Sequence, residues 1–230
     1  MATLVGMSRK NTAEFEPTQR SMIHRLPSRG SYDKAKVYEV LDQGILAHVG
    51  FVMEDSPVVI PMGYARKGDS VLLHGSAKSR LLNELARGAD VCITVTLLDG
   101  LVLARSTFHH SMNYRSVVVF GRSSVIADAE DKNAALEHIV EHLVPGRGAE
   151  ARGANEGELQ ATLVVEVPIG EASLKMRTGP PVDETKDLEI DIWAGVLPLS
   201  FEIGEPVPDE HTADDKPVPD YVLNYPRGRS

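Results

Sequence analysis

The segment from His74 to Arg80 combines residue types that bind phosphate. It reads His-Gly-Ser-Ala-Lys-Ser-Arg and lies between an apolar run typical of a strand and the helical spacing of Leu81, Leu82 and Leu85. A helix N-terminus presents unpaired backbone N–H groups and a partial positive charge. The segment adds two hydroxyls and two cations, on Ser76, Ser79, Lys78 and Arg80. It therefore predicts a phosphate site; the alternative is a capped helix with a solvated first turn.

A second polar cluster, residues 108–116, lies just before and at the start of a long apolar strand. Its donors Asn113, Arg115 and Ser116 suit a polar rim around a ligand, and the alternative is a turn whose polar groups are satisfied internally. The cluster also contains the adjacent pair His109 and His110. Neighbouring side chains of an extended chain point in opposite directions, and no third ligand has suitable spacing. The pair is therefore not expected to bind a metal ion.

Trp193 is the only tryptophan and lies in an apolar island within a loop rich in Gly and Pro. A lone tryptophan commonly anchors a core or an interface. The other interpretation is that its indole stacks on, or borders, a planar ligand. The local pattern leaves both open.

Composition narrows the class of protein. Of 230 residues, 42% are hydrophobic and 25% are charged, which is ordinary for a globular protein, and the net charge of −9 makes nucleic acid an unexpected partner. Cys92 is the only cysteine, so no internal disulfide or CxxC metal site is predicted. The N-terminus lacks the apolar segment of a signal peptide, and no apolar run is long enough to span a membrane. We expect a cytoplasmic protein without a membrane partner.

The periodicity predicts many antiparallel strands interrupted by a few helices, which indicates a mainly β fold of barrel type with helical insertions. Helices are expected after Asp33, over the run that contains Leu81, Leu82 and Leu85 with Ser76 or Ser79 as its cap, and over 130–143. Strands are expected over 44–53, 58–65, 70–74, 90–97, 101–108, 114–126 and 159–169, with Asp99-Gly100 as a hairpin turn. The predicted organisation is an N-terminal arm (1–30), a barrel domain (31–203) and an acidic Pro-rich tail (204–230), either disordered or laid on a partner subunit.

Several stretches together resemble a known family. They are residues 25–27, 48–51, 59–62, 73–76, 98–105, 110–117, 172–177 with 179–181, and 193–198. They span most of the chain from about residue 22 to residue 200. On these stretches the chain resembles the flavin-nucleotide-binding branch of the pyridoxamine 5′-phosphate oxidase superfamily, to which nitroimidazole-resistance reductases are closely related. The acidic tail lacks the C-terminal Arg and His segment that those oxidases use for pyridoxal phosphate.

The resemblance implies a six-stranded antiparallel split β-barrel of Greek-key type that forms a homodimer, with a flavin in each of two clefts between the subunits. It also implies a role for particular residues. The flavin phosphate would contact His74, Ser76, Lys78, Ser79 and Arg80. The isoalloxazine would lie beside Pro61, Met62, Gly63 and Tyr64. The ring edge or ribityl chain would contact Asn113, Arg115 and Ser116, and Trp193 would approach the ring, from this subunit or the other.

Three functions are compatible with this reading. The first is a flavin-dependent oxidoreductase acting on a small molecule, with FMN as the expected nucleotide and FAD as the alternative. No catalytic acid or base is identified. The second is a flavin carrier or sensor without turnover, and the third is a heme-binding protein on the same barrel. His48, His109 and His110 are the candidate heme ligands.

Overall fold

The structure is a computed structural model in which residues 13–226 are described. Within that range, ten strands form one antiparallel sheet. The strands are β1 (Gly30–Ser31), β2 (Leu46–Met53), β3 (Ser56–Lys67), β4 (Ser70–Ser76), β5 (Asp90–Leu103), β6 (Ser111–Arg122), β7 (Ser124–Val125), β8 (Thr162–Pro168), β9 (Glu171–Arg177) and β10 (Gly195–Pro198). The mainly β prediction is confirmed. The expected count of six strands is not, because short edge strands and β10 extend the sheet.

Five α-helices and four short 3-10 helices accompany the sheet in residues 13–226. The α-helices are α1 (Lys34–Gln43), α2 (Arg80–Ala86), α3 (Ala129–Leu143), α4 (Glu156–Ala161) and α5 (Asp220–Leu223). The 3-10 helices are η1 (Pro27–Arg29), η2 (Thr107–His109), η3 (Arg147–Ala149) and η4 (Thr185–Asp187). Side-chain caps begin the first three α-helices, through Asp33, Ser79 and Asp128. None of the described helices is long and apolar enough to span a bilayer.

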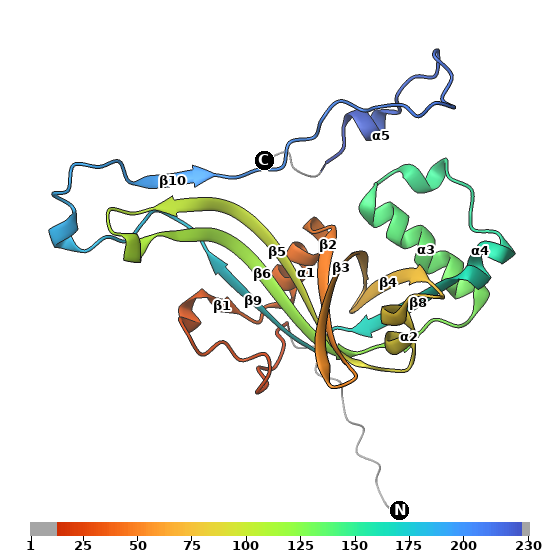
Figure 1. Cartoon of the computed structure of the whole chain (residues 1–230), viewed down its shortest axis with the longest axis horizontal. Coiled ribbons are helices and arrows are strands. Elements are labelled where there is room, and N and C mark those ends of the chain that lie inside the picture. Colours follow the sequence, from red (N-terminus) through yellow and green to blue (C-terminus); the bar gives the residue numbers. More distant parts are fainter. Residues whose placement is uncertain (1–12, 227–230) are drawn as a thin grey trace, which may run out of the picture.

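The sheet is curled but not closed. Its strand order is β1-β9-β6-β5-β2-β3-β4-β8-β7, with β10 added beside β5. The consecutive strands β8 and β9 lie in opposite halves, because β8 pairs with β4 whereas β9 pairs with β6. Figure 1 shows β4 and β8 on the side of α3, and β5, β6 and β9 extending away from it. This arrangement is consistent with a split barrel.

The two halves meet where β6 passes the end of β8. A Cβ atom added to Gly121 would lie 2.7 Å from the carbonyl oxygen of Pro168 and 2.7 Å from Val167 Cγ1. Only a residue without a side chain permits this approach. We call this contact the seam of the barrel.

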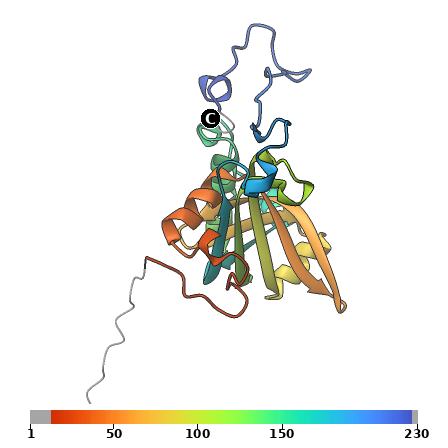
Figure 2. The same cartoon turned by 90° about the vertical axis from the view of Figure 1, so that its left-hand side faces the viewer.

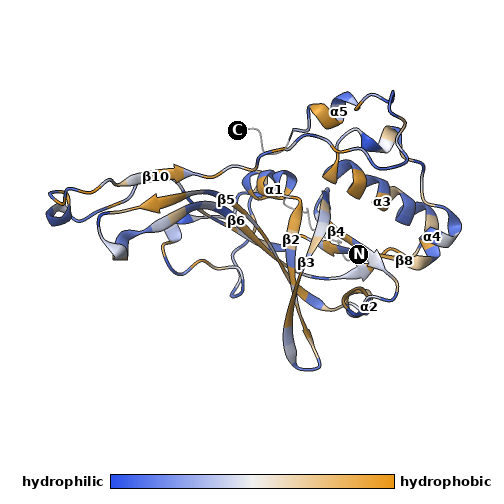
Figure 3. Ribbon diagram, turned by 45° about the horizontal axis from the view of Figure 1, so that its top comes forward, coloured by the Kyte–Doolittle hydropathy of each residue, from blue (hydrophilic) through white to orange (hydrophobic). Residues whose placement is uncertain are grey.

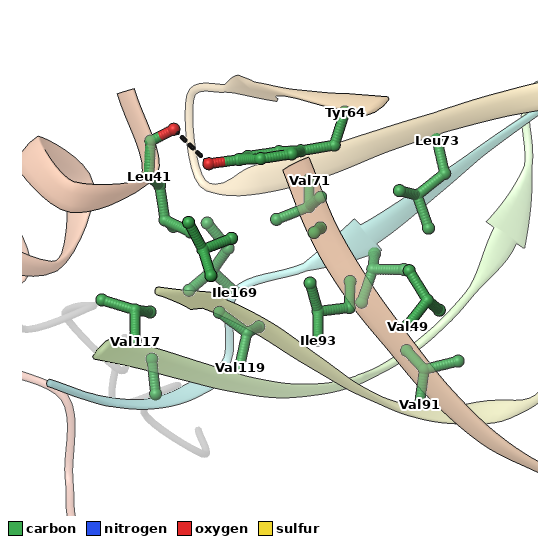
Figure 4. Packing of buried hydrophobic residues seen from close by; sticks show 14 of the residues in the cluster. Leu41, Val49, Tyr64, Val71, Leu73, Val91, Ile93, Val117, Val119 and Ile169 are labelled. Carbon is green, nitrogen blue, oxygen red and sulfur yellow. Dashed lines mark hydrogen bonds between the residues drawn. The ribbon is translucent and has the colours of Figure 1, made fainter. Parts of the chain in front are cut away.

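The core fills the interior of the curled sheet, which Figure 2 shows from the side of the projecting strands. Alternate residues of each strand point inward, so Val49, Ile93, Val119 and Val165 are fully buried. Tyr64 is also fully buried, and its hydroxyl donates to the Leu41 carbonyl oxygen at 2.6 Å (Figure 4). A second, smaller cluster packs α3 onto the opposite face of β3, β4 and β8.

The expected hairpin at Asp99-Gly100 is wrong. Strand β5 continues through these residues with a register shift between Leu98 and Gly100, and the chain reverses later, at η2. The glycine has a different role, since a Cβ there would lie 3.0 Å from the Leu197 carbonyl oxygen of β10. Beyond this bulge, β5, β6 and β10 form a projecting arm, drawn at the left of Figure 1.

Segments at both ends of the described range lie on the barrel. Phe15 is 5% exposed and belongs to the main core cluster. At the other end, the Tyr221 hydroxyl donates to Glu150 at 2.8 Å and the Tyr225 hydroxyl donates to the Leu143 carbonyl oxygen at 2.7 Å. The tail therefore returns from the arm to α3. Residues 1–12 of the predicted N-terminal arm and residues 227–230 lie outside the described residues, and the domain boundaries stay a prediction.

Candidate functional site

The strand–helix junction after β4 is held by its own hydroxyls and by one amide. Ser76 Oγ accepts the Lys78 backbone N–H at 3.2 Å, and Ser79 Oγ caps α2 by accepting the Leu82 N–H at 3.4 Å. Asn83 Nδ2 donates to the carbonyl oxygens of Ala77 and Ser79. A hydroxyl that accepts a backbone proton still has its own proton to donate. Ser76 and Ser79 therefore fix the turn and remain available as donors.

The two cations at this junction are not neutralised within the described chain. Seven arginines form ion pairs with carboxylates. The side chains of Lys78 and Arg80, both exposed, form no hydrogen bond or ion pair with any described residue. In a chain of net charge −9, two adjacent unpaired cations make a local site for an anion.

Lys78 and Arg80 line a cleft of about 500 Å³ between α2 and the β2–β3 hairpin. The hairpin supplies Val52, Met53 and Glu54, and α2 supplies Asn83, Glu84 and Arg87. Glu84 is paired with Arg87, so the unpaired charges in the cleft are two cations and Glu54. The cleft therefore carries a small positive excess and has an apolar wall. This chemistry fits a phosphate attached to an organic group.

His74 lies on β4 at the inner end of the junction. Its Nδ1 atom is buried and has no hydrogen-bond partner among the described residues. Burial lowers the pKa of its imidazole from the usual 6.5, so the ring is neutral at pH 7. An unpartnered buried nitrogen costs free energy unless something binds it. A ligand or a water molecule at the junction would satisfy this atom.

The strip Pro61–Tyr64 on β3 presents alternating faces. Pro61 is exposed and points away from the core, opposite His48 of β2, and Gly63 faces the same way. Met62 packs against the core cluster, and Tyr64 is buried within it. A ring beside this strand would therefore contact Pro61, the backbone at Gly63, and only the backbone of the other two residues.

The three predicted donors of β6 do not share a face. Ser116 points outward and is hydrogen-bonded to Thr96 Oγ1 at 2.8 Å. Asn113 and Arg115 lie on the opposite face. Arg115 pairs with Asp99 at 2.8 Å, and Asn113, which is 8% exposed, accepts a hydrogen bond from Arg177. One ligand beside one chain can contact Ser116 or the other two, but not all three.

We use "outer face" for the side of β2, β3, β5 and β6 that points away from the core. It carries His48, Pro61, Gly63, Thr96 and Ser116. The face continues onto the arm, where Met112, Leu101 and Leu197 form one row across β6, β5 and β10. The predicted ring site and the arm therefore belong to one continuous surface.

Trp193 completes the apolar part of the arm. A Cβ atom added to Gly195 would lie 2.8 Å from Trp193 Cζ2, so the indole lies against that glycine. Gly195 and Leu197 face the same way along β10, which places Trp193 beside the apolar row. The indole remains 68% exposed. We call Leu101, Met112, Leu197 and Trp193 the arm face; β10 and the end of β5 show its apolar colour in Figure 3.

The three candidate heme ligands have different surroundings. His48 is exposed on the outer face and forms no hydrogen bond with any described residue. His109 Nε2 lies 3.7 Å from Glu184, and its ring meets Phe108 edge to face. His110 is exposed, and its Nδ1 lies 2.9 Å from the Ser106 carbonyl oxygen. In the part of the chain that the structure describes, no three His, Cys, Asp or Glu residues are grouped to hold a metal ion.

Sequence reasoning missed two parts of this region. It gave no role to the connection between the strands predicted over 44–53 and 58–65, whereas this hairpin forms one wall of the cleft. Only the pairing of the strands brings the hairpin to α2. It also missed Arg177, which is 6% exposed and donates to the carbonyl oxygens of Gly179 and Pro180. A basic residue two positions before Gly179-Pro180-Pro181 was the available signal, because such turns leave carbonyl groups unpaired.

The open, curled antiparallel sheet is consistent with a split barrel. The chain belongs to the pyridoxamine 5′-phosphate oxidase family, whose sequence model matches residues 33–176. The predicted resemblance is thereby confirmed. No curated protein matches the chain.

Solved structures extend the match over nearly the whole chain. The flavocytochrome Anf3 from Azotobacter vinelandii is 39% identical with a TM-score of 0.86, and the match covers 93% of this chain and 100% of that one. The FAD and heme binding protein from Mycobacterium smegmatis is 38% identical with a TM-score of 0.82, over 85% and 96%. A candidate 5-nitroimidazole antibiotic resistance protein from Bacteroides thetaiotaomicron is 26% identical with a TM-score of 0.54, over 64% and 85%.

Proposed function

We propose that this protein is a flavoprotein that binds FAD along its outer face and also holds heme. The observation that carries the flavin assignment is the cleft in which Lys78 and Arg80 are unpaired. The sequence favoured FMN. FAD is the better proposal because the similar protein from M. smegmatis is described as binding FAD and heme, and the one from A. vinelandii is described as a flavocytochrome.

Each part of the chain has a defined task in this proposal. Lys78 and Arg80 hold the phosphates by charge-assisted hydrogen bonds, with Ser76 and Ser79 donating from the turn. Pro61 offers an exposed surface without a long side chain, against which a planar ring can lie. The bound cofactors supply the electron-transfer chemistry, and the chain positions them and excludes water.

A homodimer is part of the proposal, because the outer face is unusually apolar for a free surface. Val52 and Val59 are 65% and 63% exposed, and Leu46 is 50% exposed. Two copies packed through this face would cover these side chains and the cofactor together. Analytical ultracentrifugation of the purified protein tests this, and a monomer at micromolar concentration would contradict it.

The first experiment is an absorbance spectrum of the protein purified without added cofactor, followed by mass identification of what heat releases. Flavin bands with FAD released, together with a Soret band, are the expected result. Release of FMN would contradict the choice of nucleotide, and failure to take up either flavin would contradict the site. Tight binding of the flavin, without oxidation of any tested reductant, would make the protein a carrier or sensor.

Variants at the cleft test the phosphate assignment directly. Lys78→Ala and Arg80→Ala each remove a charged donor, which is worth about 1.5–3 kcal/mol, so FAD should bind roughly 10- to 150-fold more weakly. Lys67→Ala is the matched control, since Lys67 is exposed at the far end of β3 and does not line the cleft. Titration of the apoprotein by flavin fluorescence measures all three. Wild-type affinity in both cleft variants would show that the phosphates bind elsewhere.

A further inference from the structure

His110 differs from the other candidate heme ligands in the state of its ring. A backbone carbonyl oxygen can only accept a hydrogen bond. The contact of 2.9 Å between His110 Nδ1 and the Ser106 carbonyl oxygen therefore requires the proton on Nδ1. In the neutral ring, the lone pair then lies on Nε2. Metal-binding histidines commonly have this arrangement, in which one nitrogen is fixed by a carbonyl group and the other binds the metal.

The turn that carries His110 is held firmly. Ser106 caps η2 by accepting the Phe108 N–H at 3.2 Å on its side chain. The Ser106 carbonyl oxygen also accepts the His109 N–H at 3.0 Å. The orientation of the His110 ring is therefore fixed by the same residue that closes the turn, without any bound group.

The surface beside His110 is apolar. His110 directly precedes β6 and lies two residues before Met112, which is on the outer side of β6 and 49% exposed. Met112 is part of the arm face with Leu101, Leu197 and Trp193. An exposed apolar surface close to one oriented imidazole matches the two needs of a porphyrin, which are apolar cover for its ring and a donor for its iron.

The other two histidines fit this role less well. Nothing in the described chain orients His48, and the His109 Nε2 atom faces the Glu184 carboxylate. His48 is paired with Thr94, which lies opposite Val118 of β6, so it is about 26 Å along the strands from His110. The two histidines of one chain cannot bind the same iron.

We infer that His110 would hold the heme iron through Nε2, and that the arm face would cover the porphyrin. This inference rests on the proposed function, since it assigns a residue to the heme of that proposal. It assigns the iron ligand to one of the three candidate histidines, and it places the heme on the arm and not on the sheet around His48.

The test uses the full chain, with hemin titrated into heme-free protein and followed by its Soret band. His110→Gly should lower hemin affinity by tenfold or more and shift the Soret band, because a metal site that loses a ligand loses at least what a supporting residue contributes. Added imidazole should restore the wild-type spectrum, which a purely structural role would not allow. His109→Gly on the same turn and His48→Gly on the sheet are the matched controls, and both should retain the wild-type spectrum.

Each outcome decides a different statement. If the wild-type protein takes up no heme but binds FAD, the heme part of the proposed function falls and this inference falls with it. If the wild-type protein binds heme and His110→Gly matches His109→Gly, the inference alone is wrong. A spectral change confined to His48→Gly would move the heme to the sheet. Retained far-ultraviolet circular dichroism and flavin binding show that the variants are folded.

Discussion

Replacing Gly121 by alanine tests whether the seam holds the two halves of the barrel together. The new Cβ atom would lie 2.7 Å from the Pro168 carbonyl oxygen and from a methyl group of Val167. Ordinary contacts are 3.4–4 Å, so β6 and β8 would have to separate by about 1 Å at a close-packed position. Overpacking of this kind costs about 1–3 kcal/mol. For a domain of this size, the loss corresponds to a fall in Tm of roughly 2–12 °C.

Gly170, in the turn between β8 and β9, provides the matched control. A Cβ atom there meets nothing within 4 Å, and its φ is not in the left-handed region. Gly170→Ala should leave Tm unchanged or raise it slightly, since alanine restricts the unfolded chain. Thermal melts of the apoproteins by circular dichroism compare the two. If Gly121→Ala melts within 1 °C of Gly170→Ala, the two halves are free to separate and the seam contributes nothing to stability.

Two further predictions concern buried polar groups. Arg177→Met keeps the apolar stem but leaves the carbonyl oxygens of Gly179 and Pro180 without their donor, so the free energy of unfolding should fall by about 2–5 kcal/mol in urea titrations; a loss below 1 kcal/mol would mean that water replaces the guanidinium. Burial lowers the pKa of His74 in the native state, so below pH 6.5 the unfolded chain binds a proton more readily than the native chain does. The free energy of unfolding therefore decreases as the pH is lowered. Between pH 7 and pH 5.5 the Tm of His74→Gln should therefore decrease less than that of the wild-type protein, and equal slopes would contradict the assignment.

The sequence was sufficient to predict the helices and strands that depend on a local residue pattern. The strands β2, β3 and β4, the helix after Asp33, the helix that follows the serines of the phosphate segment, and the helix before Pro145 all appear close to their expected places. Periodicity and capping act over a few residues, so they are readable without knowledge of the fold. The phosphate site was found for the same reason, because its serines and cations are contiguous.

Features that depend on distant segments were not readable in this way. Asp99-Gly100 has the composition of a hairpin turn, but the glycine is required by the approach of β10, almost a hundred residues later. The three donors of β6 look like one cluster in the sequence and lie on two faces of a strand. The tautomer of His110 follows from the turn at Ser106, which only the structure displays.

The pairing of β4 with the distant strand β8 has a consequence during synthesis of the chain. β4 leaves the ribosome long before its partner, since Ser76 pairs with Thr162 and Ser70 with Pro168. At ordinary elongation rates that interval is roughly 5–20 seconds. Until β8 emerges, the edge of β4 that pairs with β8 has no partner strand. The nascent chain therefore exposes unpaired backbone N–H and C=O groups, to which another chain could bind. Folding of the domain is therefore a late event, completed only when residues beyond β9 are free of the exit tunnel, and a holdase chaperone has a defined period in which to act.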